Sequence, residues 1–254
     1  MRPLIAISGK GGTGKSTLSA LLVRQLVASA IRPVLAVDAD PNACLSALLG
    51  VDLPGTIGGL REAARPVKDS PGSMPKAAEV ELRLNEILAE GAGFDVITMG
   101  RPEGPGCYCY VNALLREALK RLSRNYAATV IDNQAGMEHL SRLVTAAVDV
   151  LLVVAEPTVP AARAARAIVE LSQVLPMQVG SRILVWNKVR DGRVGPQALR
   201  CVEGLPLSAT VMLPYDERLV QANAGGATLS PEMCGPELAR LLQLCGLAAS
   251  EVGR

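Results

Sequence analysis

The sequence predicts an α/β fold in which a mostly parallel central sheet of about seven or eight strands carries helices on both faces. Short apolar runs rich in β-branched residues alternate with amphipathic stretches along the chain. The apolar runs are nearly continuous and end in small or acidic residues, which is typical of parallel strands buried on both faces. With 254 residues, of which 49% are hydrophobic, the chain can bury a full core. No linker divides the pattern, so we expect residues 1–254 to form a single domain.

The individual elements follow from two periodicities. Seven β-branched apolar runs predict strands at 4–8, 34–38, 95–99, 129–132, 150–155, 183–187 and 209–213. Amphipathic spacing predicts helices over 16–29, 111–124, 158–175 and 236–246. In the first of these helices, leucines recur at helical spacing from Leu18 to Leu26. Ligands of such sheets bind at the carboxyl ends of the strands, so the residues that follow each strand are the first candidates for a site.

A phosphate-binding loop directly follows the first predicted strand. Residues 9–17 read Gly-Lys-Gly-Gly-Thr-Gly-Lys-Ser-Thr and match the frame G-x-x-x-x-G-K-[ST]. Glycines let backbone N–H groups converge on phosphate oxygens, Lys15 neutralises the β- and γ-phosphates, and the Ser16 hydroxyl holds Mg²⁺. The candidate binding residues are Gly11, Gly12, Thr13, Gly14, Lys15, Ser16 and Thr17. We therefore expect a single P-loop NTPase domain that binds ATP or ADP with Mg²⁺.

Acidic residues at the ends of two further strands fit the same site. Asp38 and Asp40 stand two residues apart at the end of the second strand, and Pro41 stops that strand. Asp132 ends a later strand, where a carboxylate can meet Mg²⁺ through water and Gly136 can bring a backbone N–H to the γ-phosphate. Each aspartate alone would be read as a helix cap. Together with the phosphate loop they indicate a nucleotide site.

Lys10 inside the loop, the run Asp38-Ala39-Asp40-Pro41 and the pattern Asp132-x-x-Ala135-Gly136 resemble the deviant Walker A ATPases. This group contains MinD, ParA, the arsenite-pump ATPase and the nitrogenase iron protein. The resemblance implies that Lys10 reaches across an ATP-sandwich homodimer to the partner's phosphates. It also implies that Asp40 orients the attacking water, that Ser16 binds Mg²⁺, and that Asp38 and Asp132 act around the metal.

The same resemblance extends to the nucleobase. Asn187-Lys188 resembles the adenine-reading motif of the group, and Pro214-Tyr215-Asp216 resembles the loop that closes over the base. An amide at a strand end offers both a donor and an acceptor, although most such asparagines only tie a turn. We therefore expect Asn187, Lys188, Pro214 and Tyr215 to contact the base.

Phosphoryl transfer explains why a second lysine matters. Charge spread over the γ-phosphoryl must be met by Lys15, Mg²⁺ and a further cation, which a lysine supplied in trans can provide as an arginine finger does elsewhere. The expected activity is Mg²⁺-dependent ATP hydrolysis, with Lys10, Lys15 and Asp40 as the catalytic residues. Dimerisation would then be part of catalysis.

A cysteine pair distinguishes this chain from a generic ATPase. Cys107-Tyr108-Cys109 follows a loop rich in glycine and proline, so we expect a metal-binding loop around residues 100–110. In an extended segment the two thiolates point to the same side, but two sulfurs do not satisfy a soft metal. Two chains related by a two-fold axis would supply four sulfurs, which suits Zn²⁺ or Ni²⁺ and also Cu(I). The other interpretation is that free cysteines pack as small apolar residues.

Several segments resemble the CooC-type accessory ATPases that mature nickel carbon monoxide dehydrogenase. The resemblance lies in residues 9–17, 38–41, 99–109, 135–140, 155–157, 186–189 and 213–215. It implies that Cys107 and Cys109 bind Ni or Zn between two subunits, and that ATP hydrolysis drives metal delivery to the client nickel enzyme, carbon monoxide dehydrogenase. Asn133-Gln134 departs from the residues that usually follow the acid in this family.

Two alternatives stay open within the superfamily. The first is an ATP-dependent reductase of the nitrogenase iron protein type, which holds an iron–sulfur cluster with one cysteine before and one just after the second acidic motif. This chain has no cysteine between Asp132 and Cys201. The second is a localisation ATPase of the MinD or ParA type, which needs an amphipathic membrane helix or a basic patch. The tail 236–254 contains two arginines and no lysine, which offers little for either.

Composition sets the expected compartment and partners. The formal net charge is +2, so no whole-molecule field favours nucleic acid or an anionic membrane. The functional loop begins nine residues from the start and no apolar run could span a bilayer, so we expect a cytoplasmic protein with no nucleic-acid and no membrane partner. The single histidine, His139, is interpreted as a packing or capping residue. Cysteines without ligand spacing are interpreted as structural: Cys44, Cys201, Cys234 and Cys245.

Overall fold

One eight-stranded sheet organises the computed structural model, which describes residues 2–59, 82–101, 116, 119–135, 147–230, 232–233 and 235–247. The strands are β1 Leu4–Gly9, β2 Val34–Asp38, β3 Ala89–Gly91, β4 Phe94–Thr98, β5 Ala128–Asp132, β6 Ala147–Ala155, β7 Gln178–Val189 and β8 Ala209–Pro214. Their order across the sheet is β3-β4-β2-β5-β1-β6-β7-β8. Only the pairing of β3 with β4 is antiparallel. The predicted α/β fold with a mostly parallel sheet is confirmed.

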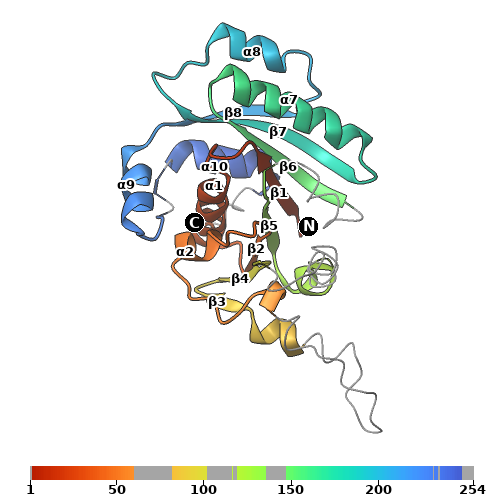
Figure 1. Ribbon diagram of the computed structural model, residues 1–254, viewed down its shortest axis with the longest axis vertical. Helices are drawn as coiled ribbons and strands as arrows, with labels where there is room; N and C mark the ends of the chain where they lie inside the picture. Colours follow the sequence, from red (N-terminus) through yellow and green to blue (C-terminus); the bar gives the residue numbers. More distant parts are fainter. Residues whose placement is uncertain are drawn as a thin grey trace, which may run out of the picture.

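Helices cover both faces of this sheet (Figure 1). Their bounds are α1 Lys15–Ala28, α2 Leu45–Leu49, α7 Val159–Val174, α8 Pro196–Val202, α9 Glu217–Gly225 and α10 Gly235–Leu244, with a 3₁₀ turn at Ser123–Asn125. α7 packs against β1, β6 and β7 on one face, and α8 lies outside α7. α1 and α10 pack together on the opposite face. The layers are therefore those of a doubly covered parallel sheet.

Strands β1, β2 and β4 to β7 divide their side chains between two apolar cores. In β1 the side chains of Ile5 and Ile7 join the core under α1, whereas Ala6 joins the core under α7. Trp186 of β7 is fully buried in the α7 core, and Phe94 of β4 is buried in the α1 core. Burial on both faces explains why the strands read as continuous apolar runs rather than as alternating ones.

The element boundaries agree with the pattern of the sequence where that pattern is long. All seven predicted strands are present, and helices 16–29, 158–175 and 236–246 correspond to α1, α7 and α10. Among the described residues, the short elements β3, α2, α8 and α9 were not predicted, nor were the helical residues 57–59 and 82–86. The predicted helix 111–124 lies largely outside the described residues, although 119–122 are helical.

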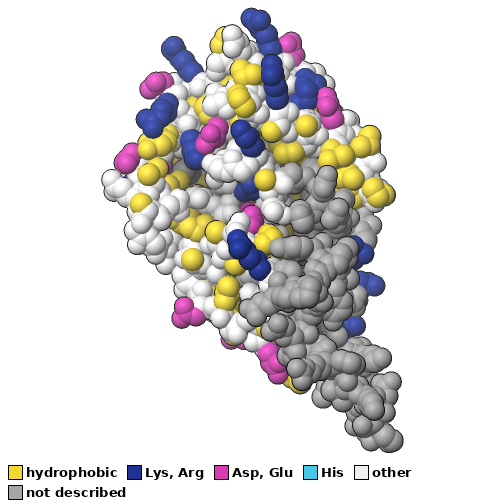
Figure 2. Space-filling model, viewed as in Figure 1, with side chains coloured by type: hydrophobic (Ala, Val, Ile, Leu, Met, Phe, Trp, Pro, Cys, Tyr) yellow, Lys and Arg dark blue, Asp and Glu magenta, His cyan; other side chains and the backbone are white. Residues whose placement is uncertain are grey.

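The visible surface mixes its charges. In Figure 2 basic, acidic and apolar side chains are interspersed over the described part of the face that is shown. Within the described ranges, the structure contains no helix that is both long and apolar enough to cross a membrane.

Candidate functional site

The phosphate loop connects β1 to α1 and is closed around one carbonyl. The Thr13 hydroxyl donates a 2.9 Å hydrogen bond to the Lys10 carbonyl, and the Lys15 ammonium lies 3.2 Å from the same oxygen. Gly14 is the N-cap of α1 and has a φ of 90°, a left-handed conformation that glycine adopts without strain. The loop therefore presents the start of α1, with its unpaired N–H groups, to the space above it.

Two glycines of the loop are needed because other parts of the chain approach closely. A Cβ on Gly9 would lie 2.3 Å from the carbonyl oxygen of Val154 in β6. A Cβ on Gly14 would lie 2.4 Å from the side-chain nitrogen of Asn187 in β7. The loop is thus packed directly against the ends of two neighbouring strands.

The two lysines of the loop have different environments. Lys15 is 8% exposed, and burial lowers the pKa of its ammonium, while the carboxylates of Asp132 and Asp40 act in the opposite direction. Lys10 is exposed. The side chain of Lys15 is therefore buried inside the site, whereas the side chain of Lys10 is exposed at its surface.

Strand register brings the two predicted metal-side carboxylates next to each other. Asp38 of β2 pairs in register with Asp132 of β5, and both are almost fully buried. Burial, followed by the charge of Asp132, raises the pKa of Asp38 to about 7. Burial also raises the pKa of Asp132 to about 6, although the Ser16 hydroxyl and the Lys15 charge oppose the shift. The ionised form of either carboxylate therefore needs a nearby cation to stabilise it.

The bonding of these carboxylates separates their roles. Asp38 accepts hydrogen bonds from the backbone N–H of Asp40 at 3.1 Å and of Leu45 at 2.9 Å, so it also shapes the turn that leads into α2. Both oxygens of Asp132 are buried without a hydrogen-bond partner of normal geometry. The hydroxyl of Ser19 beside it donates instead to the Lys15 carbonyl at 2.9 Å. The Asp132 carboxylate and the Ser16 hydroxyl beside it fit Mg²⁺. This ion prefers one or two carboxylates together with substrate phosphates and water.

Asp40 begins a short chain of hydrogen bonds. Its Oδ1 accepts from the backbone N–H and the side-chain amide of Asn42, both at 2.9 Å. The side-chain oxygen of Asn42 in turn accepts from the guanidinium of Arg101 at 2.6 Å. Asp40 is therefore oriented by Asn42, and through Asn42 it is linked to Arg101, which immediately precedes the segment 102–115 with the cysteine pair.

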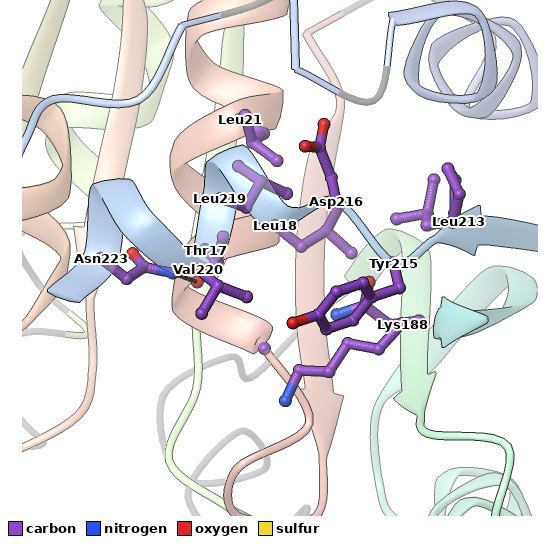
Figure 3. A pocket seen from close by; sticks show the side chains of 13 residues that line it. Thr17, Leu18, Leu21, Lys188, Leu213, Tyr215, Asp216, Leu219, Val220 and Asn223 are labelled. Atoms are coloured by element: carbon purple, nitrogen blue, oxygen red, sulfur yellow. Dashed lines mark hydrogen bonds between the residues drawn. The ribbon is translucent and has the colours of Figure 1, made fainter. Parts of the chain in front are cut away.

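Two hollows adjoin the loop. The phosphate cavity has a volume of about 870 Å³ and lies between the loop, Asp40, Gln134 and α9. The second, the base pocket, is narrower and apolar, with Leu18 and Leu21 of α1 facing Leu219 and Val220 of α9. In Figure 3 the Tyr215 ring and the Lys188 side chain lie together on one side of this pocket. The combined shape suits a ligand with one anionic end and one flat apolar end.

The structure places the four predicted base residues at this pocket but with different contacts. Asn187 and Pro214 line it, and Asn187 also donates from its amide to the Thr13 carbonyl at 2.8 Å. The Lys188 ammonium donates to the Gly12 carbonyl at 2.9 Å and to Glu156 at 2.6 Å. Tyr215 lines the pocket beneath the guanidinium of Arg190, which is 3.8 Å from the ring centroid. Lys188 thus braces the phosphate loop.

Some residues of the site were not found from the sequence. The apolar wall of the base pocket comes partly from α9, an element that was not predicted because it is short. Asp216 accepts from the N–H of Arg218 at 2.9 Å and caps this helix. An aspartate just before a run of helix formers is the signal that could have revealed α9. Gln134 was noticed only as a departure from a motif, yet it lines the phosphate cavity.

Several predicted residues lie outside the described ranges. These are Gly136, Cys107, Cys109, His139 and Cys234. Among the described residues no group of three or more histidine, cysteine, aspartate or glutamate side chains could hold a metal ion. Cys44 is exposed, Cys201 is partly buried, and Cys245 is buried. The predicted metal loop around 100–110 therefore stays a prediction.

Comparison with known proteins places the chain in a family. Residues 4–229 match the CobQ/CobB/MinD/ParA nucleotide binding domain. The chain belongs to this family. An ATP-binding protein of Methanocaldococcus jannaschii is 35% identical over 233 residues, which cover 89% of this chain and 90% of that protein. The ATPase predicted from the phosphate loop is supported by this membership, and the chain is an ATPase of the MinD/ParA family.

Two further similarities concern the fold and part of the sequence. The cell division ATPase MinD of Pyrococcus furiosus superposes with a TM-score of 0.66 at 22% identity, covering 97% of this chain and 98% of that one. At that identity it supports the fold alone. The carbon monoxide dehydrogenase accessory protein CooC of Rhodospirillum rubrum is 34% identical over 168 residues, which cover 60% of this chain and 62% of CooC.

Proposed function

We propose that this MinD/ParA-family ATPase is a dimeric metallochaperone that inserts nickel into carbon monoxide dehydrogenase. The observation that carries the proposal is the 34% identity to CooC of Rhodospirillum rubrum. The cysteine pair Cys107 and Cys109 supports it, since a metallochaperone needs soft ligands that a generic ATPase does not. In this proposal the metal ion is a substrate that the protein delivers, and not a resident cofactor.

ATP would lie across the two hollows of the site. Its phosphates fit the N–H groups at the start of α1, from Gly11 to Thr17, and its adenine fits the base pocket between α1 and α9. Asn187, Pro214 and Tyr215 line the adenine side, and Lys188 supports the loop from beneath. The cavity volume of about 870 Å³ is of the size that a nucleotide tail with its metal requires.

The residues around the terminal phosphate have separate tasks in this proposal. Lys15 neutralises the β- and γ-phosphates, and the motif after Asp132 suits Gly136 to a backbone contact with the γ-phosphate. Ser16 and Asp132 would hold Mg²⁺, with Asp38 behind them, and the ion would neutralise the charge that develops on the phosphate oxygens. Asp40 orients the attacking water from across the cavity.

A homodimer would join the ATP site to the cargo site. Lys10 is exposed rather than folded into its own site, which suits a lysine that reaches the phosphates of a partner subunit. The same two-fold axis would bring two cysteine pairs together and provide four thiolates for one Ni²⁺ or Zn²⁺ ion. Nucleotide state and metal affinity would then be coupled through one interface.

Metal analysis of the purified chain tests the proposal. We expect about one Ni or Zn per dimer after loading, and loss of that metal in the double variant Cys107→Ser/Cys109→Ser. The variant Cys201→Ser is the matched control, because Cys201 is a free cysteine on α8 that does not line the phosphate cavity, and it should keep the metal. ADP affinity should be the same in all three proteins.

Other outcomes would replace the proposal with a different one. A brown protein that contains iron and sulfide would indicate the reductase of the nitrogenase iron protein type. Hydrolysis that is stimulated by lipid vesicles or DNA, without bound metal, would indicate a localisation ATPase. Metal content that survives the double cysteine substitution would show that the cargo site lies elsewhere.

A further inference from the structure

The two amides that follow Asp132 occupy different environments. Asn133 is buried, its backbone N–H donates to the Ile7 carbonyl at 3.2 Å, and its side-chain amide donates to the same oxygen at 3.0 Å. These two bonds fix the chain after β5 against the end of β1, directly before the phosphate loop. Asn133 therefore has a structural role, and it sets the position from which the next residue projects.

Gln134 lines the phosphate cavity and carries a buried side-chain acceptor that is unused. It lines that cavity together with Gly11, Lys15 and Asp40. Its side-chain oxygen is buried, and no hydrogen-bond partner for it exists among the described residues. A buried acceptor left without a partner destabilises the structure, so an acceptor in such a position is expected to meet a ligand group or a bound water.

The place of Gln134 in the cavity determines which ligand group it meets. The phosphates attach to the loop and to Lys15 on one wall, so the terminal phosphoryl faces the walls formed by Asp40 and Gln134. An attacking water must approach in line with the bond that breaks, from the side away from the loop. Three polar side chains line the described part of the cavity after β2 and β5: Asp40, Asn42 and Gln134. The Asn42 amide is already bonded to Asp40 and its oxygen to Arg101, which leaves Asp40 and Gln134 to meet the water.

We propose that Gln134 binds the attacking water during ATP hydrolysis, with its side-chain oxygen accepting a hydrogen bond from that water. This inference rests on the proposed function. The water oxygen forms a bond to the γ-phosphorus, and the bond from that phosphorus to the bridging oxygen breaks, leaving its electron pair on ADP. The water proton passes to Asp40 and then to solvent. Gln134 itself takes up no proton, so it shares the orientation of the water with Asp40, and Asp40 also acts as the base.

An amide suits this position better than a further acid. Asp40 lines the cavity, and two further carboxylates, Asp38 and Asp132, are buried side by side in the neighbouring strands β2 and β5. A fourth negative charge facing the γ-phosphate would repel it, whereas a neutral amide offers an acceptor without that charge. The charge state of residue 134 should therefore affect ATP more than ADP, because only ATP carries the facing phosphoryl.

Two substitutions at this position separate orientation of the water from charge. Gln134→Ala in the full-length chain should lower kcat for Mg-ATP at least tenfold and leave KM and the Kd for ADP within twofold. Gln134→Glu should also lower kcat, and it should weaken the Kd of a non-hydrolysable ATP analogue several-fold more than the Kd of ADP. Gln197→Ala removes an exposed glutamine side chain on α8 and is the matched control, with wild-type kcat expected.

The outcomes distinguish a failure of the Gln134 inference from a failure of the proposed ATP hydrolysis. If Gln134→Ala hydrolysed ATP within twofold of the wild-type rate, Gln134 would not bind the attacking water. Equal loss of ADP and ATP-analogue affinity, together with a lowered Tm, would assign a structural role and would also overturn the inference. A wild-type protein that bound ATP without hydrolysing it would overturn the proposed activity itself, and this inference with it.

Discussion

The side-chain amide of Asn187 donates a 2.8 Å hydrogen bond to the backbone carbonyl of Thr13, which joins the end of β7 to the middle of the phosphate loop. The two residues are 174 positions apart in the sequence. Gly14, the next residue of the loop, could not carry a side chain here without meeting this amide. The base side and the phosphate side of the site are therefore one connected structure.

The first prediction concerns this bond. Asn187→Ala removes the donor and leaves the Thr13 carbonyl unpaired, so the phosphate loop loses a contact that holds it in place. We expect the free energy of ADP binding to weaken by about 1–2 kcal/mol, which corresponds to a roughly tenfold higher Kd. Isothermal titration calorimetry measures the change. Asn85→Ala, at an exposed position away from the site, should leave the Kd unchanged. An unaltered Kd in Asn187→Ala would mean that the bond does not support the nucleotide site.

Most strands could be predicted from the sequence because a strand that is buried on both faces consists of an uninterrupted run of apolar residues. The run 34–38 coincides with β2, since every residue of that strand is buried. The three-residue β3 is different: it pairs antiparallel at the sheet edge and ends in glycine, so it contains no such run. Helix α2 has five residues and is defined by the turn around Asp38 rather than by periodicity.

The second prediction separates two glycines of the phosphate loop. Gly9→Ala places a methyl group 2.3 Å from the backbone carbonyl oxygen of Val154, which should lower the free energy of unfolding by about 1–3 kcal/mol. Gly11→Ala meets nothing within 4 Å, so its free energy of unfolding should be close to wild type. Gly11 lines the phosphate cavity, and its added methyl group should weaken nucleotide binding instead. Urea unfolding and ADP titration of both variants measure this reversal.

The site was predictable as a set of positions but not as a set of contacts. The carboxyl ends of β2 and β5 gave the neighbourhood of Asp38 and Asp132, and the register confirms that they pair. The sequence could not reveal that Lys188 folds onto the Gly12 carbonyl, because that contact depends on a left-handed φ of 59° at Lys188. Nor could it show the path from Asp40 to Arg101, since the bond between Asn42 and Arg101 spans 59 residues.

The third prediction is a pH dependence caused by the buried carboxylates. Both pKa values are raised in the folded chain, to about 7 for Asp38 and about 6 for Asp132, from an ordinary value of 3.8. The folded state therefore binds more protons between about pH 4 and pH 7, so the free energy of unfolding without metal should fall as pH rises through this window. Chemical denaturation at pH 5, 6, 7 and 8 without Mg²⁺ measures the slope.

Asp132→Asn tests the cause of this slope. The substitution removes one of the two buried charges and its repulsion of Asp38, so the variant should be more stable than wild type at pH 8 by about 1 kcal/mol or more. Mg-ADP should stabilise wild type most above pH 7, where both carboxylates are ionised, and should stabilise the variant less than wild type. A variant with the wild-type slope would show that Asp132 does not titrate in this range.

The last prediction separates binding from hydrolysis through Lys10. Lys10→Ala should retain an ADP affinity within about threefold of wild type, because the exposed Lys10 side chain is not needed to close its own loop. Its backbone carbonyl, which accepts from Thr13 and Lys15, is kept in the variant. ATP-dependent dimerisation and hydrolysis should both be lost, since the γ-phosphoryl of each subunit would lack the cation from its partner.

Sedimentation velocity and phosphate release measure these two properties of Lys10→Ala. Lys120→Ala, another exposed lysine, is the control and should dimerise and hydrolyse as wild type does. In a mixture of Lys10→Ala with an Asp40→Ala variant, one mixed site would combine an intact Asp40 with the Lys10 of the partner chain. That mixture should recover part of the activity that each variant lacks, because a lysine acting in trans serves the other subunit's nucleotide. Hydrolysis at the wild-type rate by Lys10→Ala alone would place the needed cation elsewhere.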